Sequence, residues 1–299
     1  GGKSWPAGTM IASGVTASSM SSLAKELNLD IGRTGNIPVQ TYNLSAPRVA
    51  LYKSWTGSMD EGWTRWIFEQ FEFKFTNIID AEIRAGNLKE DYDVIVIPAM
   101  STNAIINGNE KGTVDPKYVG GITEQGVRNI KQFVEEGGVL VAMNGGCKFP
   151  IDKLGVPAKN ALAGLMASRR SSGQNQKAQA VKFACPGSIL RANFNTKHPV
   201  AYGMPDEGAL LFTRSMAFNI SASFGSENPT KVIAKYPKGN LLMSGWLLGG
   251  KYLNEKAAAI DTPLGKGKVI LLGFGIQSRA QPHGTFKMLF NSLLYSAAR

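Results

Sequence analysis

The sequence predicts an α/β fold with a mainly parallel central sheet and an antiparallel extension. Between residues 48 and 143, short apolar runs typical of buried strands alternate with segments whose apolar residues recur at helical spacing. This alternation favours parallel strands joined by right-handed crossovers, with helices on both faces of the sheet. The expected strands are 48–52, 75–80, 92–98 and 139–143, and the expected helices are 60–71 and 123–136.

The second half of the chain is less regular. Its apolar runs are separated by turns rather than by helices, which favours antiparallel strands added to the same sheet. These runs are 184–194, 209–220, 231–236 and 241–246. A hairpin turn at 265–267 then leads into a strand at 268–274, and a closing amphipathic helix is expected at 285–298.

Two domains are expected, a lead-in appendage at 1–46 and the main domain at 47–299. Breaker residues concentrated at 32–38 and 45–47 place the boundary there. The appendage is predicted to contain a short strand at 8–12 and a helix at 18–29. Some forty residues bury too little apolar surface to fold alone, so we expect the appendage to dock on the main sheet or on a partner subunit.

Composition excludes several classes of function. No apolar run approaches the roughly 20 residues of a membrane helix, and the first residues lack a signal-peptide pattern. The net charge of +11 is spread along the chain, which favours anionic partners such as cell-envelope polymers. Its one local concentration has no aromatic residues among the cations, so no nucleic-acid partner is expected. That concentration consists of Arg169, Arg170, Lys177 and Lys182.

Cys147 is the candidate nucleophile. The apolar run 139–142 ends at Asn144-Gly145-Gly146-Cys147, and a glycine turn at the carboxyl edge of a parallel sheet can present a thiol to substrate. The alternative is a small hydrophobic side chain at a strand end. Catalysis needs a base, for which the sequence offers His283 or His198, with Glu61 or Asp60 as a conceivable orienting acid. The other cysteine, Cys185, belongs to no C-x-x-C motif either, so the redox compartment stays open.

Residues at the expected strand ends outline a candidate binding cleft. The connection 101–121 leaves the same edge and is long enough to form a lid or a wall of that cleft. For each candidate the alternative is a helix cap, a turn or an exposed position. The cleft residues are Trp55, Ser58, Asp60, Ser101, Asn103, Asn144, Cys147, Gln277, Arg279 and His283. No metal site and no cofactor is expected.

Tryptophans offer another kind of binding surface. An exposed platform for carbohydrate or peptide would use Trp55, Trp63, Trp66 and Trp246. The spacing of Trp63, Trp66 and Phe71 instead fits the inner face of the expected helix 60–71.

Five segments carry a resemblance to a known family. The chain resembles the class I glutamine amidotransferase-like superfamily, whose flavodoxin-like sheet forms a three-layer sandwich. More closely, it resembles the carboxy-terminal module of secreted bacterial proteins that begin with a zinc carboxypeptidase-like domain. The segments are 47–52, 92–98, 198–205, 267–274 and 284–291. The resemblance implies a secreted or periplasmic accessory domain, with the upstream carboxypeptidase-like domain as its partner and a homodimer as a further expectation.

The departures from the family pattern bear on catalysis. Active members of the superfamily resemble one another in a glycine directly after the cysteine, whereas here Lys148 follows Cys147. They also resemble one another in a histidine two residues before a glutamate, whereas no glutamate accompanies His283. Neither histidine begins the His-x-x-Glu pattern of zinc carboxypeptidases. The favoured hypothesis is therefore a non-catalytic accessory domain that assists assembly or substrate positioning. The alternatives are a cysteine-dependent hydrolase or amidotransferase that uses Cys147 and His283, and a carbohydrate- or peptide-binding module.

Overall fold

Five parallel strands form one half of a continuous sheet. The computed structural model describes residues 4–37, 41–165, 181–221 and 229–298. The parallel strands stand in the order β2, β1, β3, β4, β12, the flavodoxin-like arrangement. Their bounds are β1 (Val49–Tyr52), β2 (Phe75–Ile78), β3 (Val94–Ile97), β4 (Val139–Met143) and β12 (Gly267–Leu272).

Antiparallel strands continue the sheet beyond β12. β11 pairs with β12 through a hairpin and with β9 on its other side, and β9 leads on to β6 and β10. β7 pairs with β6, while β8 pairs with both β11 and β5. Their bounds are β5 (Ala158–Asn160), β6 (Ser188–Phe194), β7 (Glu207–Phe212), β8 (Phe218–Ile220), β9 (Lys231–Lys235), β10 (Leu242–Ser244) and β11 (Ala257–Leu264).

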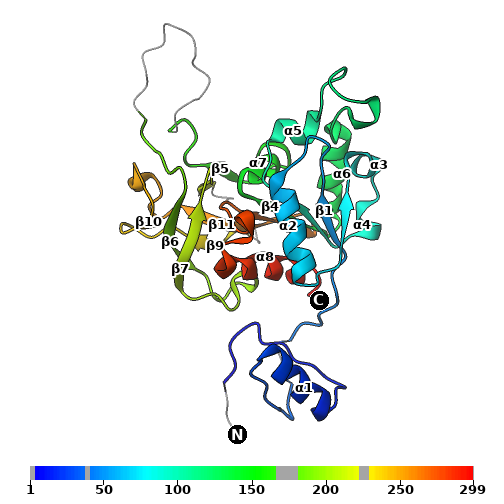
Figure 1. Cartoon of the computed structure of the whole chain (residues 1–299), viewed down its shortest axis with the longest axis vertical. Helices are drawn as coiled ribbons and strands as arrows, with labels where there is room; N and C mark the ends of the chain where they lie inside the picture. Colours follow the sequence, from blue (N-terminus) through cyan, green and yellow to red (C-terminus); the bar gives the residue numbers. More distant parts are fainter. Residues whose placement is uncertain (1–3, 38–40, 166–180, 222–228, 299) are drawn as a thin grey trace.

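Helices cover both faces of the parallel half (Figure 1). Alternate residues of each strand point to opposite sides, so Val49 and Leu51 pack with Phe68 of α2 and Leu289 of α8. Ala50 packs in a second cluster with residues of the helices on the other face. One layer holds α2 (Met59–Gln70) and α8 (His283–Tyr295); the other holds α3 (Asp80–Ala85), α4 (Leu88–Asp91), α5 (Thr102–Asn107), α6 (Thr123–Glu135) and α7 (Lys148–Lys153).

This arrangement confirms the predicted fold class. The molecule is a three-layer, flavodoxin-like sandwich with a mainly parallel central sheet and an antiparallel extension. A glycine turn at Asn144–Cys147, here called the elbow, follows directly at the carboxyl end of β4. The strands near residues 49, 95, 140 and 270 are adjacent and parallel, as predicted.

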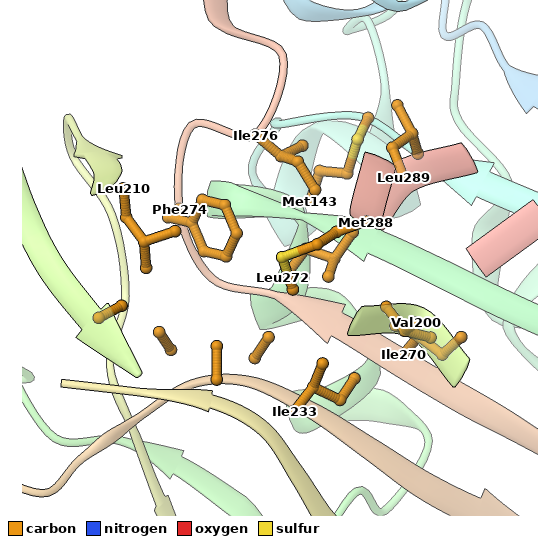
Figure 2. Packing of buried hydrophobic residues seen from close by; sticks show 14 of the residues in the cluster. Met143, Val200, Leu210, Ile233, Ile270, Leu272, Phe274, Ile276, Met288 and Leu289 are labelled. Atoms are coloured by element: carbon orange, nitrogen blue, oxygen red, sulfur yellow. The ribbon is translucent and has the colours of Figure 1, made fainter. Parts of the chain in front are cut away.

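One apolar core links the two halves of the sheet. Figure 2 shows Met143 of β4 and Leu272 of β12 in the same cluster as Leu210 of β7 and Ile233 of β9. Met288, on α8, closes this cluster and is fully buried. The antiparallel strands are therefore packed into the main domain.

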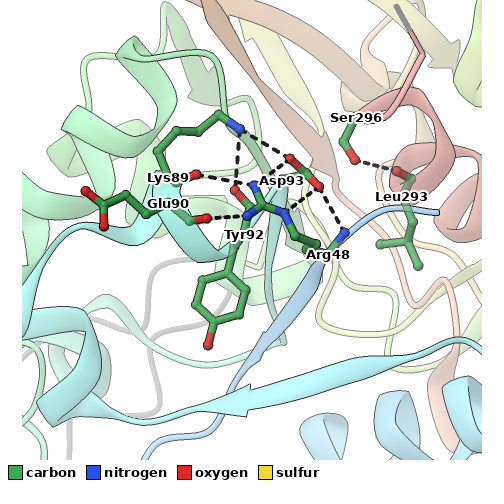
Figure 3. A network of polar contacts seen from close by, with 7 residues as sticks. All are labelled: Arg48, Lys89, Glu90, Tyr92, Asp93, Leu293 and Ser296. Carbon is green, nitrogen blue, oxygen red and sulfur yellow. Dashed lines mark hydrogen bonds and ion pairs between the residues drawn. The ribbon is translucent and has the colours of Figure 1, made fainter. Parts of the chain in front are cut away.

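Arg48 and Asp93 fasten the amino ends of β1 and β3 together (Figure 3). The Asp93 carboxylate accepts from the Arg48 backbone N–H at 3.0 Å and from its Nε at 3.1 Å. Lys89 Nζ lies 3.3 Å from Asp93 Oδ1, and Arg48 Nη1 also donates to the Glu90 carbonyl. The hydrogen bonds from Arg48 hold the pKa of Asp93 well below its usual range.

The lead-in segment barely touches the main domain. Its helix, α1 (Ala17–Leu27), has no buried residue and lies away from the sheet (Figure 1). The segment meets the body where Gly8 approaches the Tyr202 side chain and where Leu44 bridges to Ala298. The strand expected at 8–12 is wrong, because these residues form a turn and an irregular stretch.

One further expectation is wrong, and one strand was not predicted. The run 209–220 is not one strand but two, β7 and β8, because the chain turns at Arg214 with a φ of 50°. β11, the neighbour of β12 in the sheet, lies in a stretch that the sequence left unassigned. Of the predicted cationic concentration, Arg169, Arg170 and Lys177 fall outside the described residues.

Candidate functional site

The elbow after β4 is built by a close contact between two loops. Asn144 to Cys147 form the short 3-10 helix η2 (Asn144–Cys147), which leads directly into α7. A Cβ on Gly146 would lie 2.4 Å from the Pro98 carbonyl oxygen, so only glycine fits against the loop that follows β3. The turn brings Cys147 into the same apolar cluster as Leu140 and Ala142 of β4.

Cys147 is inaccessible in this structure. Its side chain is 0% exposed, and Sγ donates a hydrogen bond back to the Ala142 carbonyl at 3.2 Å. Burial raises the pKa of the Cys147 thiol. Within the described residues, no histidine is hydrogen-bonded to it. Cys147 therefore packs as a small hydrophobic side chain at a strand end.

The two histidines have other partners. His283 begins α8, is exposed, and stacks on Phe286 with ring centroids 4.9 Å apart. His198 is buried between β6 and η3 (Pro199–Ala201), where its Nδ1 accepts from the Val200 N–H. The proton of the neutral imidazole is thus on Nε2, which lies 3.1 Å from Asp261 Oδ2. Neither ring is placed to take a proton from Cys147.

The conceivable orienting acids are also engaged elsewhere. Asp60 Oδ2 accepts from the Ala99 backbone N–H at 2.8 Å, and burial raises the pKa of this carboxyl. Glu61 accepts from Asn77 Nδ2 at 2.9 Å. Asp60 therefore joins α2 to the loop after β3, and Glu61 joins α2 to β2.

Three of the predicted cleft residues do come together. Ser58 caps α2 and also donates to the carbonyl of Ala99, the residue whose backbone N–H donates to Asp60. Gln277 Nε2 donates to the Asp60 carbonyl at 3.2 Å and to Thr64 Oγ1 at 2.9 Å. These bonds join the loops after β1, β3 and β12. The group fastens these three loops together at the edge of the sheet.

The remaining cleft candidates have structural places of their own. Ser101 caps α5 by accepting from the Ala104 N–H, and Asn103 accepts from Asn107 one turn later. Asn144 Nδ2 donates to the Thr213 carbonyl at 3.1 Å. Arg279 is exposed in a left-handed conformation with a φ of 53°. Cap, turn and surface roles thus account for these four residues.

Trp55, another of the cleft candidates, lines a pocket. The pocket has a volume of about 320 Å³ and lies where β1 and β2 end, against the connection between α5 and α6. Its other functional side chains, which the sequence analysis did not select, are Asp80, Arg84, Lys117 and Tyr118. The sequence feature that pointed toward them is the length of the 101–121 connection, whose residues 117–119 form one wall of this pocket.

The tryptophans do not share one surface. Trp63 and Trp66 face outward from α2, with 36% and 44% of their surfaces exposed, so the expected inward orientation is wrong. Phe71 is likewise 49% exposed, although it contacts Phe286 and Phe290. Trp246 follows β10, at the opposite end of the sheet from Trp55. A single platform of four tryptophans is therefore excluded.

The described part of the chain offers neither a cluster of metal-binding side chains nor a membrane-spanning helix. It contains no group of three or more His, Cys, Asp or Glu side chains that could hold a metal ion. None of its helices is long and apolar enough to cross a bilayer.

Comparison with known proteins identifies similar folds at low sequence identity. Neither a family model nor a curated protein matches the sequence. A ThuA-like protein from Bacteroides uniformis is 11% identical with a TM-score of 0.47, over 87% of this chain and 95% of that one. PurLQS from Thermotoga maritima is 14% identical with a TM-score of 0.47, over 84% of this chain and 99% of that one. A cytoplasmic protein from Salmonella typhimurium is 17% identical with a TM-score of 0.46, over 85% and 99%.

Proposed function

We propose that this chain is a non-catalytic accessory domain of a secreted or periplasmic zinc carboxypeptidase-like protein, where it assists assembly or substrate positioning. The observation that carries the non-catalytic role is the environment of Cys147. The only cysteine at the elbow is fully buried, and its Sγ is hydrogen-bonded to the Ala142 carbonyl. A nucleophile has to reach substrate, and this one does not.

The chemistry of thiol catalysis supports the same conclusion. Attack on an amide needs a thiolate, a proton donor for the leaving amine and hydrogen-bond donors for the oxyanion. Burial favours the neutral thiol at Cys147. His283 is stacked on Phe286, and His198 is paired with Asp261. A cysteine hydrolase or amidotransferase that uses Cys147 and His283 would have to rearrange β4, η2 and α8 together.

The parent protein is inferred from the resemblance of the five sequence segments. Fold by itself does not decide function, so the link to a peptidase rests on those segments and their order along the chain. The expected partner is the upstream zinc carboxypeptidase-like domain, and no cofactor is expected in this chain.

The deciding experiment measures turnover with and without the elbow thiol. The purified chain is assayed for glutaminase, esterase and peptidase activity beside Cys147→Ser, whose hydroxyl can still donate to the Ala142 carbonyl. We expect no turnover from either protein. Activity that disappears in Cys147→Ser, with an unchanged circular dichroism spectrum, would contradict the proposal.

A second measurement tests the accessory role. The natural upstream region is joined to this chain, and peptide processing is compared with that of the upstream region alone. We expect faster processing or higher yield of folded peptidase when the chain is present. Equal processing and equal yield would contradict an accessory role.

The exposed tryptophans of α2 favour one alternative, a carbohydrate- or peptide-binding module. Trp63 and Trp66 meet edge to face with centroids 6.3 Å apart and stay accessible on one helix. Co-sedimentation with insoluble cell-wall polymer tests this function. Binding that falls in Trp66→Ala but persists in Trp246→Ala would support it.

A further inference from the structure

The pocket beside Trp55 has the position and shape of a small-molecule site. It opens at the carboxyl ends of β1 and β2, the edge at which open α/β sheets bind ligands. Its volume of about 320 Å³ is at the small end of the roughly 300–1,000 Å³ typical of ligand pockets. Its lining does not include Cys147, which lies in η2 after β4.

Two aromatic rings form a fixed apolar wall. Trp55 and Tyr118 contact each other with centroids 4.7 Å apart. Asn109 Nδ2 donates to the Trp55 backbone carbonyl at 3.2 Å and to the Tyr118 backbone carbonyl at 3.1 Å, so one side chain holds the backbones of the two residues together. The apolar side of a ligand would meet a preformed surface.

Arg84 and Lys117 make the pocket cationic. Arg84 Nη1 donates to the Gly121 carbonyl, which anchors the guanidinium while other N–H groups remain for a ligand. Lys117 Nζ lies 4.7 Å from the centre of the Tyr118 ring. In the part of the chain that the structure describes, neither cation is within 4.0 Å of a carboxylate oxygen.

Asp80 places one carboxyl group behind this surface. It is 1% exposed, and Oδ1 accepts from the Tyr52 hydroxyl at 2.6 Å. Burial raises the pKa of this carboxyl, and hydrogen bonds from the Tyr52 hydroxyl and the Trp55 backbone N–H oppose that shift. The ionised form of Asp80, which high pH favours, opposes a second negative charge on any ligand that the two cations attract.

We propose that the pocket binds a monocarboxylate attached to an apolar or aromatic group. Arg84 and Lys117 bind the carboxylate, and Trp55 and Tyr118 pack against the apolar group. Asp80 selects against ligands with two negative charges. This chemistry is shared by free N-acylated apolar amino acids and by peptides that end in an apolar residue, and binding requires no upstream peptidase.

Isothermal titration calorimetry of the full chain at pH 8 provides the test. The probes are N-acetylphenylalanine, its carboxamide and the dianion phenyl phosphate. We expect the acid to bind and each of the other two probes to bind at least about tenfold more weakly. The carboxamide loses the charge-assisted hydrogen bonds to Arg84 and Lys117, and phenyl phosphate brings a second negative charge toward Asp80. No heat from millimolar acid, or equal binding of acid and carboxamide, would overturn the proposal.

Single substitutions test the roles of Lys117 and Asp80 in ligand binding. Lys117→Gln should weaken binding of N-acetylphenylalanine several-fold. Lys111→Gln makes the same change on the same connection but outside the pocket, and should leave binding unchanged. Asp80→Asn keeps an acceptor for the Tyr52 hydroxyl and should narrow the preference for acid over phenyl phosphate. Equal effects of Lys117→Gln and Lys111→Gln would contradict the assignment, and so would an unchanged preference in Asp80→Asn.

The same titration distinguishes the two sources of the ligand. A hexapeptide ending in phenylalanine is compared with its carboxyl-terminal amide and with N-acetylphenylalanine. Binding of the free peptide at least as tight as that of the small acid, lost on amidation, assigns the pocket to peptide ends. Binding of the small acid alone assigns it to free acids.

Discussion

Cys147 decides the chemistry of the elbow, and its burial predicts how it reacts. Thiolates react with alkylating agents, and burial both raises the thiol pKa and excludes the reagent. Cys185 is also buried, with a raised pKa. We therefore expect neither thiol to be modified by iodoacetamide in the native chain and both to be modified in denaturant. Mass spectrometry of tryptic peptides measures this, and rapid native modification of Cys147 would contradict the burial argument.

Asp93 predicts an effect on stability. Its carboxylate accepts charged hydrogen bonds from Arg48 and is only 13% exposed. Asp93→Asn should lower the free energy of unfolding by roughly 1–3 kcal/mol at pH 7, as expected for hydrogen bonds to charged groups. Urea denaturation measures the change. The exposed pair Lys148–Asp152 supplies the control, because Asp152→Asn should cost less than about 0.5 kcal/mol.

The same residue gives a pH dependence with a definite sign. The folded-state pKa of Asp93 is lowered, so its contribution is present above the unfolded pKa and is lost as pH falls through the folded pKa. The gap between the native chain and Asp93→Asn should stay constant from pH 7 to about 5 and shrink below about 4. A gap that widens on acidification would show that the pKa is not lowered.

Single residues were the hardest part of the site to predict. The sequence identifies Cys147 and the edge residues Ser58, Asp60 and Gln277, because strand ends are visible as apolar runs that stop at polar residues. It does not tell whether a polar side chain faces solvent or bonds to a neighbouring loop. The pocket residues Asp80 and Arg84 belong to a helix that follows β2, and their approach to Tyr118 depends on the path of the 101–121 connection.

At the scale of the element, the elbow after β4 is held by its second glycine. A methyl group at Gly146 would lie 2.4 Å from the Pro98 carbonyl oxygen, whereas one at Gly145 meets no atom closer than 4.0 Å. Gly146→Ala should therefore cost about 1–3 kcal/mol, the usual range for overpacking. Thermal denaturation compares the two variants, and equal melting temperatures for Gly145→Ala and Gly146→Ala would contradict the packing argument.

None of the described residues of the lead-in segment, 4–37 and 41–46, is buried. α1 has no buried residue, and an isolated helix of 11 residues is marginal in water. We expect residues 4–46 to pack against a second subunit, so that the full chain associates in a concentration-dependent way and a chain starting at residue 47 does not. Analytical ultracentrifugation measures this. Identical sedimentation of both chains, at equal solubility, would contradict the prediction.

Most strands were predictable, and the exceptions have physical reasons. β1, β3, β4 and β12 are continuous apolar runs, the pattern of strands buried on both faces. β11 reads AAAIDTPL, in which alanines carry no strand preference, and it forms because the hairpin at Gly265 and its place beside β12 put it in the core. The exposed orientation of Trp63 and Trp66 was not predicted, because helical spacing does not tell which face of α2 packs against the sheet.

At the scale of the whole molecule, β12 joins two halves of different construction. It pairs in parallel with β4 on one side and antiparallel with β11 on the other. The large apolar cluster contains residues of both halves, including Val96 of β3 and Ile233 of β9. The parallel half holds the pocket and the elbow, while the antiparallel half contributes much of the core that supports β12.

This continuity predicts that the main domain unfolds as one unit. Ile233 is fully buried in β9, so Ile233→Ala should cost roughly 2–5 kcal/mol. Because β11 and β12 carry the core from one half to the other, peptides of β3 should lose hydrogen-exchange protection by as much as peptides of β9. Leu242→Ala, in the exposed edge strand β10, is the control and should change little. If β9 peptides lost protection while β3 peptides kept it, the two halves would be separate folding units, and the pocket would not depend on the antiparallel strands for its stability.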